Sequence, residues 1–321
     1  MGSLSVVISA FNEEAKIREC LESVSFADEI IFVDNESTDK TVEIAKKYTS
    51  KIFSCPNNPM LNVNKNFGFS KATLEWILCL DADERVTPEF RDEIKKVIYE
   101  PGEDSSTRRV RRGFAQNDND VVNGYWIPRK NIIFGKWLEH TGWYPDHQLR
   151  LFRRKKGKFP ERHVHEMIAV DGKTDYLKEH IVHYNYESID QFLHKLFYIY
   201  APNEAKELLR KGYTFNWLDA LRFPLGEFVR RFFAQAGYKD GFHGLMLSLL
   251  MAFYHLIVFA YVWEKKKYYD PEHLDILTDM EREARKGYKD LLYWVKSEQL
   301  KTAKNPFYAT LLRIRRRLIW V

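Results

Sequence analysis

The chain has few cysteines, and their spacing does not suit a disulfide framework or a metal site. Among 321 residues there are only Cys20, Cys55 and Cys79, an odd number without the short paired spacings of zinc ligands. We therefore expect reduced thiols in a cytoplasmic protein. The N-terminus also lacks a basic segment followed by a long apolar run, because Val6-Val7-Ile8 is too short, and this absence predicts no secretion signal.

A strong excess of one charge is also missing. The 50 Lys and Arg residues against 45 Asp and Glu residues give a formal net charge of +5. Such a small excess does not indicate a nucleic-acid partner, and basic residues are scarce near the acidic stretch at 81–84. The hydrophobic share of 45% is enough to bury a large core, which excludes a disordered or fibrous chain.

The first part of the chain alternates apolar strands with amphipathic helices. Strands are expected at 4–10, 29–33, 51–54 and 76–80, and Asn12 is expected to cap the first helix. This order predicts an α/β fold with a mostly parallel sheet flanked by helices. Polar segments follow the strands, and open α/β sheets bind ligands at that edge.

The alternation ends near residue 100. Residues 101–120 are polar and without period, which indicates a mobile insertion. Strand-like aromatic segments follow, and a helix is expected to begin near Ser188 and end near Gly212. We therefore divide the chain into an α/β domain over 1–184 and a helical region over 185–321.

Residues 245–263 are almost entirely apolar. A run of this length is close to the roughly 20 residues that span a bilayer. Lys265-Lys266-Lys267 follow it, and arginines alternate with bulky apolar residues over 311–321. The pattern predicts a membrane-associated helical region, peripheral or monotopic. Whether the run spans the bilayer or lies in its interface stays open, and a buried core helix is the alternative.

Three acidic side chains, Asp81, Asp83 and Glu84, follow the strand expected at 76–80. Carboxylates gathered at a strand end repel one another, and burial raises the cost unless a cation neutralises them. Mg²⁺ or Mn²⁺ would do so, because these ions prefer oxygen ligands and in turn hold phosphate oxygens. A solvated acidic turn before the helix expected at Pro88 is the alternative interpretation.

Several stretches together resemble the family 2 glycosyltransferases of the GT-A fold. They are SVVISAFNEE at 5–14, IFVDNESTDKT at 31–41, KNFG at 65–68 and LDADER at 80–85. GWYPDHQLRLFRR at 142–154 and VHE at 164–166 are similar to the branch that contains bacterial lipopolysaccharide core glucosyltransferases. The resemblance implies a UDP-sugar donor, a membrane glycolipid acceptor such as the lipopolysaccharide inner core, and Mn²⁺ or Mg²⁺ as cofactor.

The resemblance also implies roles for the donor residues. Asp34 would accept a hydrogen bond from the uracil ring, Asp81 would lie near the ribose, and Asp83 would coordinate the metal. A helix cap is the alternative for Asp34, and Lys65 would either reach the diphosphate or remain solvated. The residues expected around the nucleotide sugar are Ser9, Ala10, Phe11, Glu13, Asp34, Asn35, Lys65, Asp81, Ala82 and Asp83.

On the acceptor side, the resemblance makes Asp146 the general base that takes the proton of the acceptor hydroxyl. The commoner motif has Glu before this Asp, whereas Pro145 stands here, and a turn carboxylate is the alternative. His165 is implied as a further metal ligand, with His183 as the second choice. The expected acceptor contacts are Trp143, Tyr144, Gln148 and Arg150. In-line displacement, with glucose as the expected sugar, would invert the anomeric centre.

Two other classes of function stay open at this point. A nucleotidyltransferase uses a similar α/β sheet, but it is expected to carry an early Gly-rich phosphate loop, which SAFNE at 9–13 is not. A non-catalytic membrane protein that binds nucleotide sugars would keep the same residues without turnover. The sugar and the acceptor are not identified by the sequence.

Overall fold

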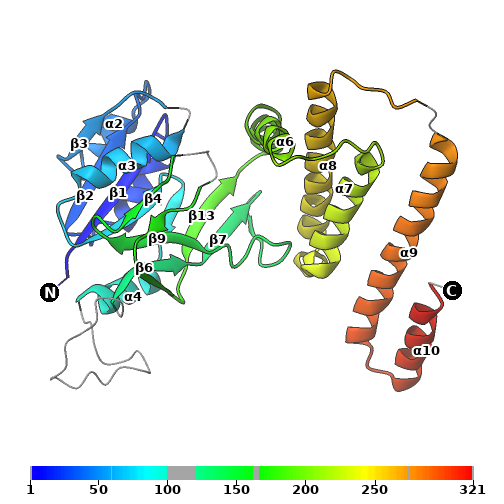
Figure 1. Ribbon diagram of the computed structural model, residues 1–321. Helices are drawn as coiled ribbons and strands as arrows, with labels where there is room; N and C mark the ends of the chain where they lie inside the picture. The colour runs from blue at the N-terminus through cyan, green and yellow to red at the C-terminus, as the bar shows by residue number, and fades with distance from the viewer. Residues whose placement is uncertain (1, 59, 100–120, 162–165, 273–274, 320–321) are drawn as a thin grey trace. The chain divides into compact units, whose positions relative to one another are not determined.

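The structure is a computed structural model that describes residues 2–58, 60–99, 121–161, 166–272 and 275–319 (Figure 1). The chain forms two compact units. The first contains residues 1–132 and 144–185, and the second contains residues 133–143 and 186–321. The insertion expected at 101–120 lies outside the described residues.

A seven-stranded sheet forms the centre of the first unit, in the order β12-β6-β9-β4-β1-β2-β3. Its strands are β1 (Leu4–Ala10), β2 (Glu29–Asp34), β3 (Ile52–Ser54), β4 (Trp76–Asp81), β6 (Val122–Ile127), β9 (Gln148–Arg153) and β12 (Lys173–Tyr176). Strands β4, β1, β2 and β3 are parallel to one another, as β12 is to β6, whereas β9 is antiparallel to both of its neighbours. The α/β class with a mostly parallel sheet is therefore confirmed.

Helices cover this sheet because its central strands are apolar on both faces. The helices are α1 (Ile17–Ser23), α2 (Thr41–Ala45), α3 (Leu61–Lys71) and α4 (Pro88–Tyr99). Val6 and Ile8 of β1 pack with α1 and α4, while Val7 faces the cluster that contains Phe69 of α3. Gly68 lets α3 approach closely, since a Cβ there would lie 2.5 Å from the Val7 side chain.

A smaller sheet brings a distant strand to the acidic stretch. It contains β5 (Glu84–Val86), β13 (Ile181–Tyr186) and β7 (Arg129–Ile133) in that neighbour order β5-β13-β7. In the antiparallel register of β13 and β5, His183 is opposite Glu84. A two-stranded ribbon of β10 (Gly157–Lys158) and β11 (Ala169–Val170) completes the strands described in the first unit.

The prediction that Asn12 caps the first helix is wrong. Helix α1 begins at Ile17 with Lys16 in the cap position. Asn12 has a positive φ of 53° and its side-chain oxygen accepts a hydrogen bond of 2.8 Å from the Thr38 backbone N–H. The side chain therefore fastens the loop after β1 to the loop after β2, which a local capping rule does not anticipate.

The second unit is mainly helical. Its described elements are β8 (Lys136–Trp137), α5 (Ile189–Lys195), the π-helical turn η2 (Leu196–Tyr200), α6 (Ala201–Arg210), α7 (Asp219–Val229), the π-helical turn η3 (Arg230–Ala234), the 3₁₀ turn η4 (Gly237–Asp240), α8 (Phe242–Lys265), α9 (Ile276–Thr302) and α10 (Pro306–Arg317). A helix begins next to Ser188 as expected, and the Ser188 hydroxyl caps it by accepting from the Gln191 N–H at 3.1 Å. Within the described residues, α8 is the one helix long and apolar enough to cross a membrane.

Candidate active site

The carboxyl ends of β1, β2 and β4 lie side by side and bring the expected donor residues together (Figure 1). In the sheet register, Ser9 is opposite Asp81 and Ala10 is opposite Asp34. Asp34 and Ala82 are buried, whereas Phe11 is 40% exposed at the edge. Three segments far apart in the sequence thus meet where an α/β sheet binds ligands.

Hydrogen bonds fix the loops that follow β1 and β2. The Glu13 N–H donates to the Thr41 hydroxyl at 2.8 Å. Asp34 accepts from the Ser37 N–H at 3.1 Å through one oxygen, so it does stabilise the turn before α2. The Asn35 side-chain oxygen accepts from Asn64 of α3 at 2.7 Å, a contact that the sequence did not predict. The loops are therefore held together before any ligand binds.

Lys65 and Arg150 neutralise Asp81. The Lys65 Nζ lies 2.5 Å from one carboxylate oxygen, and the Arg150 Nη2 lies 2.7 Å from the other. Burial alone would raise the pKa of Asp81, but Arg150 and Lys65 bring this pKa well below its usual range. Lys65 is buried, so the interpretation of it as a solvated helix lysine is wrong.

Glu84 is fully buried and is balanced in the same way. It accepts from the Asp81 N–H at 2.9 Å, and its carboxylate lies 3.2 Å from Arg150 Nη2 and 3.4 Å from Arg129 Nη1. The acidic stretch is thus not a solvated turn. Arginine and lysine side chains supply most of the charge balance that the sequence had assigned to a metal ion.

Asp83 differs from its two acidic neighbours. Its carboxylate lies beside a histidine, with His183 Nε2 at 3.5 Å, whereas those of Asp81 and Glu84 pair with arginine or lysine. Burial raises the pKa of Asp83, but hydrogen bonding and charge from His183 leave it lowered overall. His165 lies outside the described residues. Among those that are described, no group of three His, Cys, Asp or Glu side chains is arranged to hold a metal ion.

Asp146, the expected base, lies in a ring of donors. One carboxylate oxygen accepts from Arg129 Nε at 2.8 Å and Nη2 at 2.5 Å, and from Asn131 Nδ2 at 3.3 Å. The other accepts from Gln148 Nε2 at 2.9 Å. Burial raises the pKa of Asp146, but Arg129 and the other donors lower it overall, so the carboxylate is ionised.

Asn131 connects the two halves of the site. Its side-chain oxygen is 2.7 Å from His183 Nδ1, while its amide nitrogen donates to Asp146. A continuous path of contacts therefore runs from Asp83 through His183 and Asn131 to Asp146. Arg129 and Asn131 were not predicted as site residues, although they are polar side chains two residues apart on one strand, where they share a face.

The remaining expected acceptor residues have defined places. Gln148 donates a hydrogen bond to Asp146, and Arg150 donates one to Asp81. Tyr144, in the first unit, lies edge-on to the His180 ring at 6.4 Å. Trp143 belongs to the second unit, where the Arg231 guanidinium lies over its ring at 5.4 Å. Their contact with an acceptor stays a prediction.

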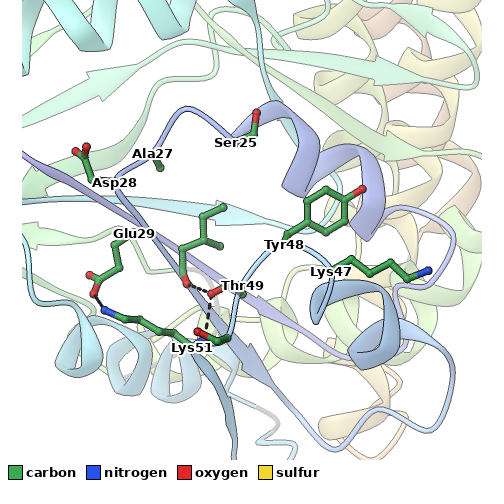
Figure 2. Close-up of a pocket in the computed structure, with 10 residues that line it drawn as sticks. Ser25, Ala27, Asp28, Glu29, Lys47, Tyr48, Thr49 and Lys51 are labelled. Carbon is green, nitrogen blue, oxygen red and sulfur yellow. Dashed lines mark hydrogen bonds and ion pairs between the residues drawn. The ribbon is translucent and has the colours of Figure 1, made fainter.

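A hollow of about 460 Å³ lies elsewhere in the first unit. Figure 2 shows Glu29, Thr49 and Lys51 in its wall, where Thr49 donates to the Ile30 carbonyl at 2.6 Å. Glu29 begins β2 and Asp34 ends it, so this hollow is at the opposite edge of the sheet from the donor residues. It is not part of the candidate active site.

The fold and the charged edge define an α/β protein whose candidate ligand site lies at the carboxyl ends of parallel strands. Residues 5–158 match the family described as Glycosyl transferase family 2. The chain thus contains a domain that matches this family.

Curated relatives of this chain are also named as glycosyltransferases. An uncharacterized glycosyltransferase of Rickettsia typhi is 28% identical over 263 residues, which cover 79% of this chain and 84% of the relative. The lipopolysaccharide core biosynthesis glycosyltransferase LpsC of Rhizobium meliloti is 24% identical over 270 residues, which cover 82% of this chain and 92% of LpsC.

Two solved structures show more distant similarity. Glucosyl-3-phosphoglycerate synthase from Mycobacterium tuberculosis, in complex with Mn²⁺, UDP and glucosyl-3-phosphoglycerate, has a TM-score of 0.38 at 15% identity, covering 67% of this chain and 82% of that chain. S. aureus TarS 1-349 in complex with UDP also has a TM-score of 0.38 at 15% identity, covering 85% and 94%.

Proposed function

We propose that the protein is an inverting glycosyltransferase that moves a sugar, with glucose as the first candidate, from a UDP-sugar to a hydroxyl of a membrane glycolipid. The observation that carries this proposal is Asp146, a carboxylate held ionised by Arg129 and connected through Asn131 and His183 to Asp83. The family match favours glycosyl transfer over the nucleotidyltransferase alternative. The relationship to LpsC supports a lipopolysaccharide-core type of acceptor.

The donor nucleotide would bind at the carboxyl edge of the sheet. Asp34 offers a carboxylate oxygen to the uracil ring, and Asp81 offers one to the ribose, each from the end of a parallel strand. Phe11 is exposed beside them and presents an apolar surface to the base. Lys65 holds Asp81 in place, and its charge also favours the nearby diphosphate.

The residues around Asp83 fit a divalent cation such as Mn²⁺ or Mg²⁺. In its neutral form, with Nδ1–H donating to the Asn131 oxygen, His183 would present the Nε2 lone pair to the Asp83 carboxylate. A bound cation would then take the place of the His183 charge that lowers the pKa of Asp83. Two acceptor atoms in contact are stabilised by a cation between them. His183 and His165 are thus both candidate ligands beside Asp83. When bound, the ion would act as a Lewis acid for the departing diphosphate.

Asp146 would perform the acid-base step. Its carboxylate removes the proton of the acceptor hydroxyl as that oxygen bonds to the anomeric carbon, while the bond from this carbon to the UDP oxygen breaks. Arg129 keeps Asp146 ionised, and Gln148 orients it. Attack opposite the leaving group inverts the anomeric centre, and this step requires only one carboxylate on the acceptor side.

A glycolipid acceptor places the reaction at a membrane. We propose the cytoplasmic face of the inner membrane as the location. Nucleotide sugars would reach the glycolipid acceptor there, and the cysteines would stay reduced. The 24-residue apolar helix α8, about 36 Å long, supports this location. The relative LpsC, named as a lipopolysaccharide core biosynthesis glycosyltransferase, also supports this location.

A thermal-shift measurement tests donor and metal binding together. UDP with Mn²⁺ at about 100 times its dissociation constant is expected to stabilise the native state by about 2.7 kcal/mol and raise Tm by several degrees. Chelator or Asp83→Ala should remove the Mn²⁺-dependent part of this rise. The exposed Asp175, changed to Asn, is the matched control and should keep it. An equal rise in chelator would contradict the assignment of a metal to Asp83.

The role of Arg129 is tested by a pH profile. Arg129→Met removes the cation that lowers the pKa of Asp146, so this pKa should rise and the base should be protonated at a higher pH. The acid limb of kcat/KM against pH is therefore expected to move to higher pH. Arg129→Lys keeps the charge and should leave the limb closer to that of the original protein. If the acid limb did not move in Arg129→Met, Arg129 would not be the residue that lowers the pKa of the base.

A further inference from the structure

Helix α8 has two different faces. Leu247, Ala252, Val258 and Val262 are buried against other helices of the second unit. The opposite side is exposed and apolar along the whole helix, and we call this set the α8 stripe: Phe242, Met246, Leu249, Phe253, Leu256 and Trp263. Their spacing of mostly three and four residues places them on one side of the helix.

The α8 stripe is more apolar than a helix face that normally contacts water. Phe242 is 72% exposed, Leu249 is 46% exposed and Trp263 is 42% exposed. Contiguous apolar surfaces of this kind mark contacts with a membrane or another protein. The buried face of α8 is already packed against α6 and α7, so the stripe is the face left for a partner (Figure 1).

Charges next to the middle of α8 argue against a spanning orientation. Tyr254, near the midpoint, donates to Glu204 of α6, and His255 Nε2 lies 3.7 Å from Glu227 of α7. Glu227 is buried and also pairs with Arg231. If α8 crossed a bilayer, these charges would lie near the centre of the hydrocarbon, where ionised side chains are costly. An α8 that lies flat keeps them on the protein side, away from lipid.

Positive charge follows α8 and is repeated in α10, and it indicates the kind of partner that the α8 stripe contacts. Exposed Lys265, Lys266 and Lys267 follow the stripe directly. Helix α10 and its C-cap Leu318 combine exposed apolar side chains, Phe307, Ile314 and Leu318, with arginines, which are Arg313, Arg315, Arg316 and Arg317. Such basic and apolar mixtures bind anionic lipid headgroups, whereas the same lysines on a second copy of the chain would add like charge to the contact.

We propose that α8 lies in the plane of an anionic membrane surface, with the α8 stripe among the acyl chains, and does not span the bilayer. The proposal deepens the proposed function and rests on it for the membrane-borne acceptor. It makes the protein monotopic, with both ends of α8 on the same side of the membrane. The first unit would then work on glycolipid headgroups without leaving the aqueous phase.

Vesicle binding of the full chain tests the partner. Sedimentation with vesicles of phosphatidylglycerol and phosphatidylcholine is expected to recover the protein, and pure phosphatidylcholine should recover at least about tenfold less. Leu249→Glu combined with Phe253→Glu should lower the partition coefficient on the anionic vesicles at least about tenfold. The matched control changes two exposed apolar residues of the first unit, Leu61→Glu with Met167→Glu, and should bind normally.

Thiol labelling in sealed inner-membrane vesicles tests the orientation. Cys20 and Cys79 are buried, so Cys55→Ser gives a background with no exposed native thiol. Lys239→Cys and Lys267→Cys, exposed positions just before and just after α8 and outside the α8 stripe, should both react with an impermeant maleimide from the cytoplasmic side.

Three outcomes would overturn the proposal. They are labelling of the two ends from opposite sides, normal vesicle binding by the stripe variant, and a stripe variant whose only change is dissociation of a dimer. The UDP and Mn²⁺ thermal shift, measured on the same variants, keeps a failure of membrane docking distinct from a failure of the proposed function.

Discussion

Asp146→Asn is expected to lower kcat by about 10²- to 10⁴-fold, the range that a general base contributes. Asparagine matches the shape of aspartate but does not accept the proton of the acceptor hydroxyl. Because Asp146 is not among the residues proposed to contact the donor nucleotide, the KM for the UDP-sugar should change little. The measurement is UDP release with membranes that carry the acceptor, at saturating donor.

The matched control for this variant is Asp175→Asn, an exposed aspartate of the same unit. It should retain kcat. Both variants should also keep the thermal shift with UDP and Mn²⁺, which shows that the donor site is folded. If Asp146→Asn retained more than about a tenth of kcat with that shift intact, Asp146 would not be the base.

The sheet and its donor edge were predictable because the information is local. Each of β1, β2 and β4 is a mostly apolar run followed by polar residues, and the alternation with helices predicts that these strands are parallel. Parallel strands end at one edge, so Asp34 and Asp81 had to come close. The antiparallel place of β9 between β4 and β6 was not predictable, because it depends on pairing between distant segments.

The charge balance of the site depends on that distant pairing. Arg150 reaches Asp81 and Glu84 only because β9 lies beside β4, and the sequence analysis had placed this arginine on the acceptor side. His183 reaches Asp83 through the register of β13 with β5. An acidic cluster therefore did indicate a need for cations, but the local sequence did not distinguish a metal ion from side chains 66 to 69 residues away.

Arg129 and Asn131 left a weaker signal. Both lie in the polar first half of β7, at positions that share one face, and polar side chains that are buried there need partners. The pattern indicates a polar network but not which distant residue completes it. Asp146 completes it because the chain returns beside β7, where the Arg129 N–H donates to the Asp146 carbonyl at 3.1 Å.

Arg150→Met is expected to lower the free energy of unfolding by about 3–5 kcal/mol, because it leaves Asp81 and Glu84 short of a buried cation. Urea unfolding followed by circular dichroism measures this loss. The matched control is Arg153→Met on the same strand, whose ion pair with Glu75 is partly exposed, and it should lose about 1 kcal/mol or less.

A second substitution identifies the cause of that loss. In Arg150→Met, Glu84 keeps only Arg129 at 3.4 Å, so Glu84→Gln should recover part of the stability in the double variant by removing the uncompensated charge. If the two losses simply added, the cost would come from the missing packing of the arginine side chain. Recovery would instead mean that the acidic stretch is stable because protein cations balance Asp81 and Glu84, which leaves Asp83 as the carboxylate available to a metal ion.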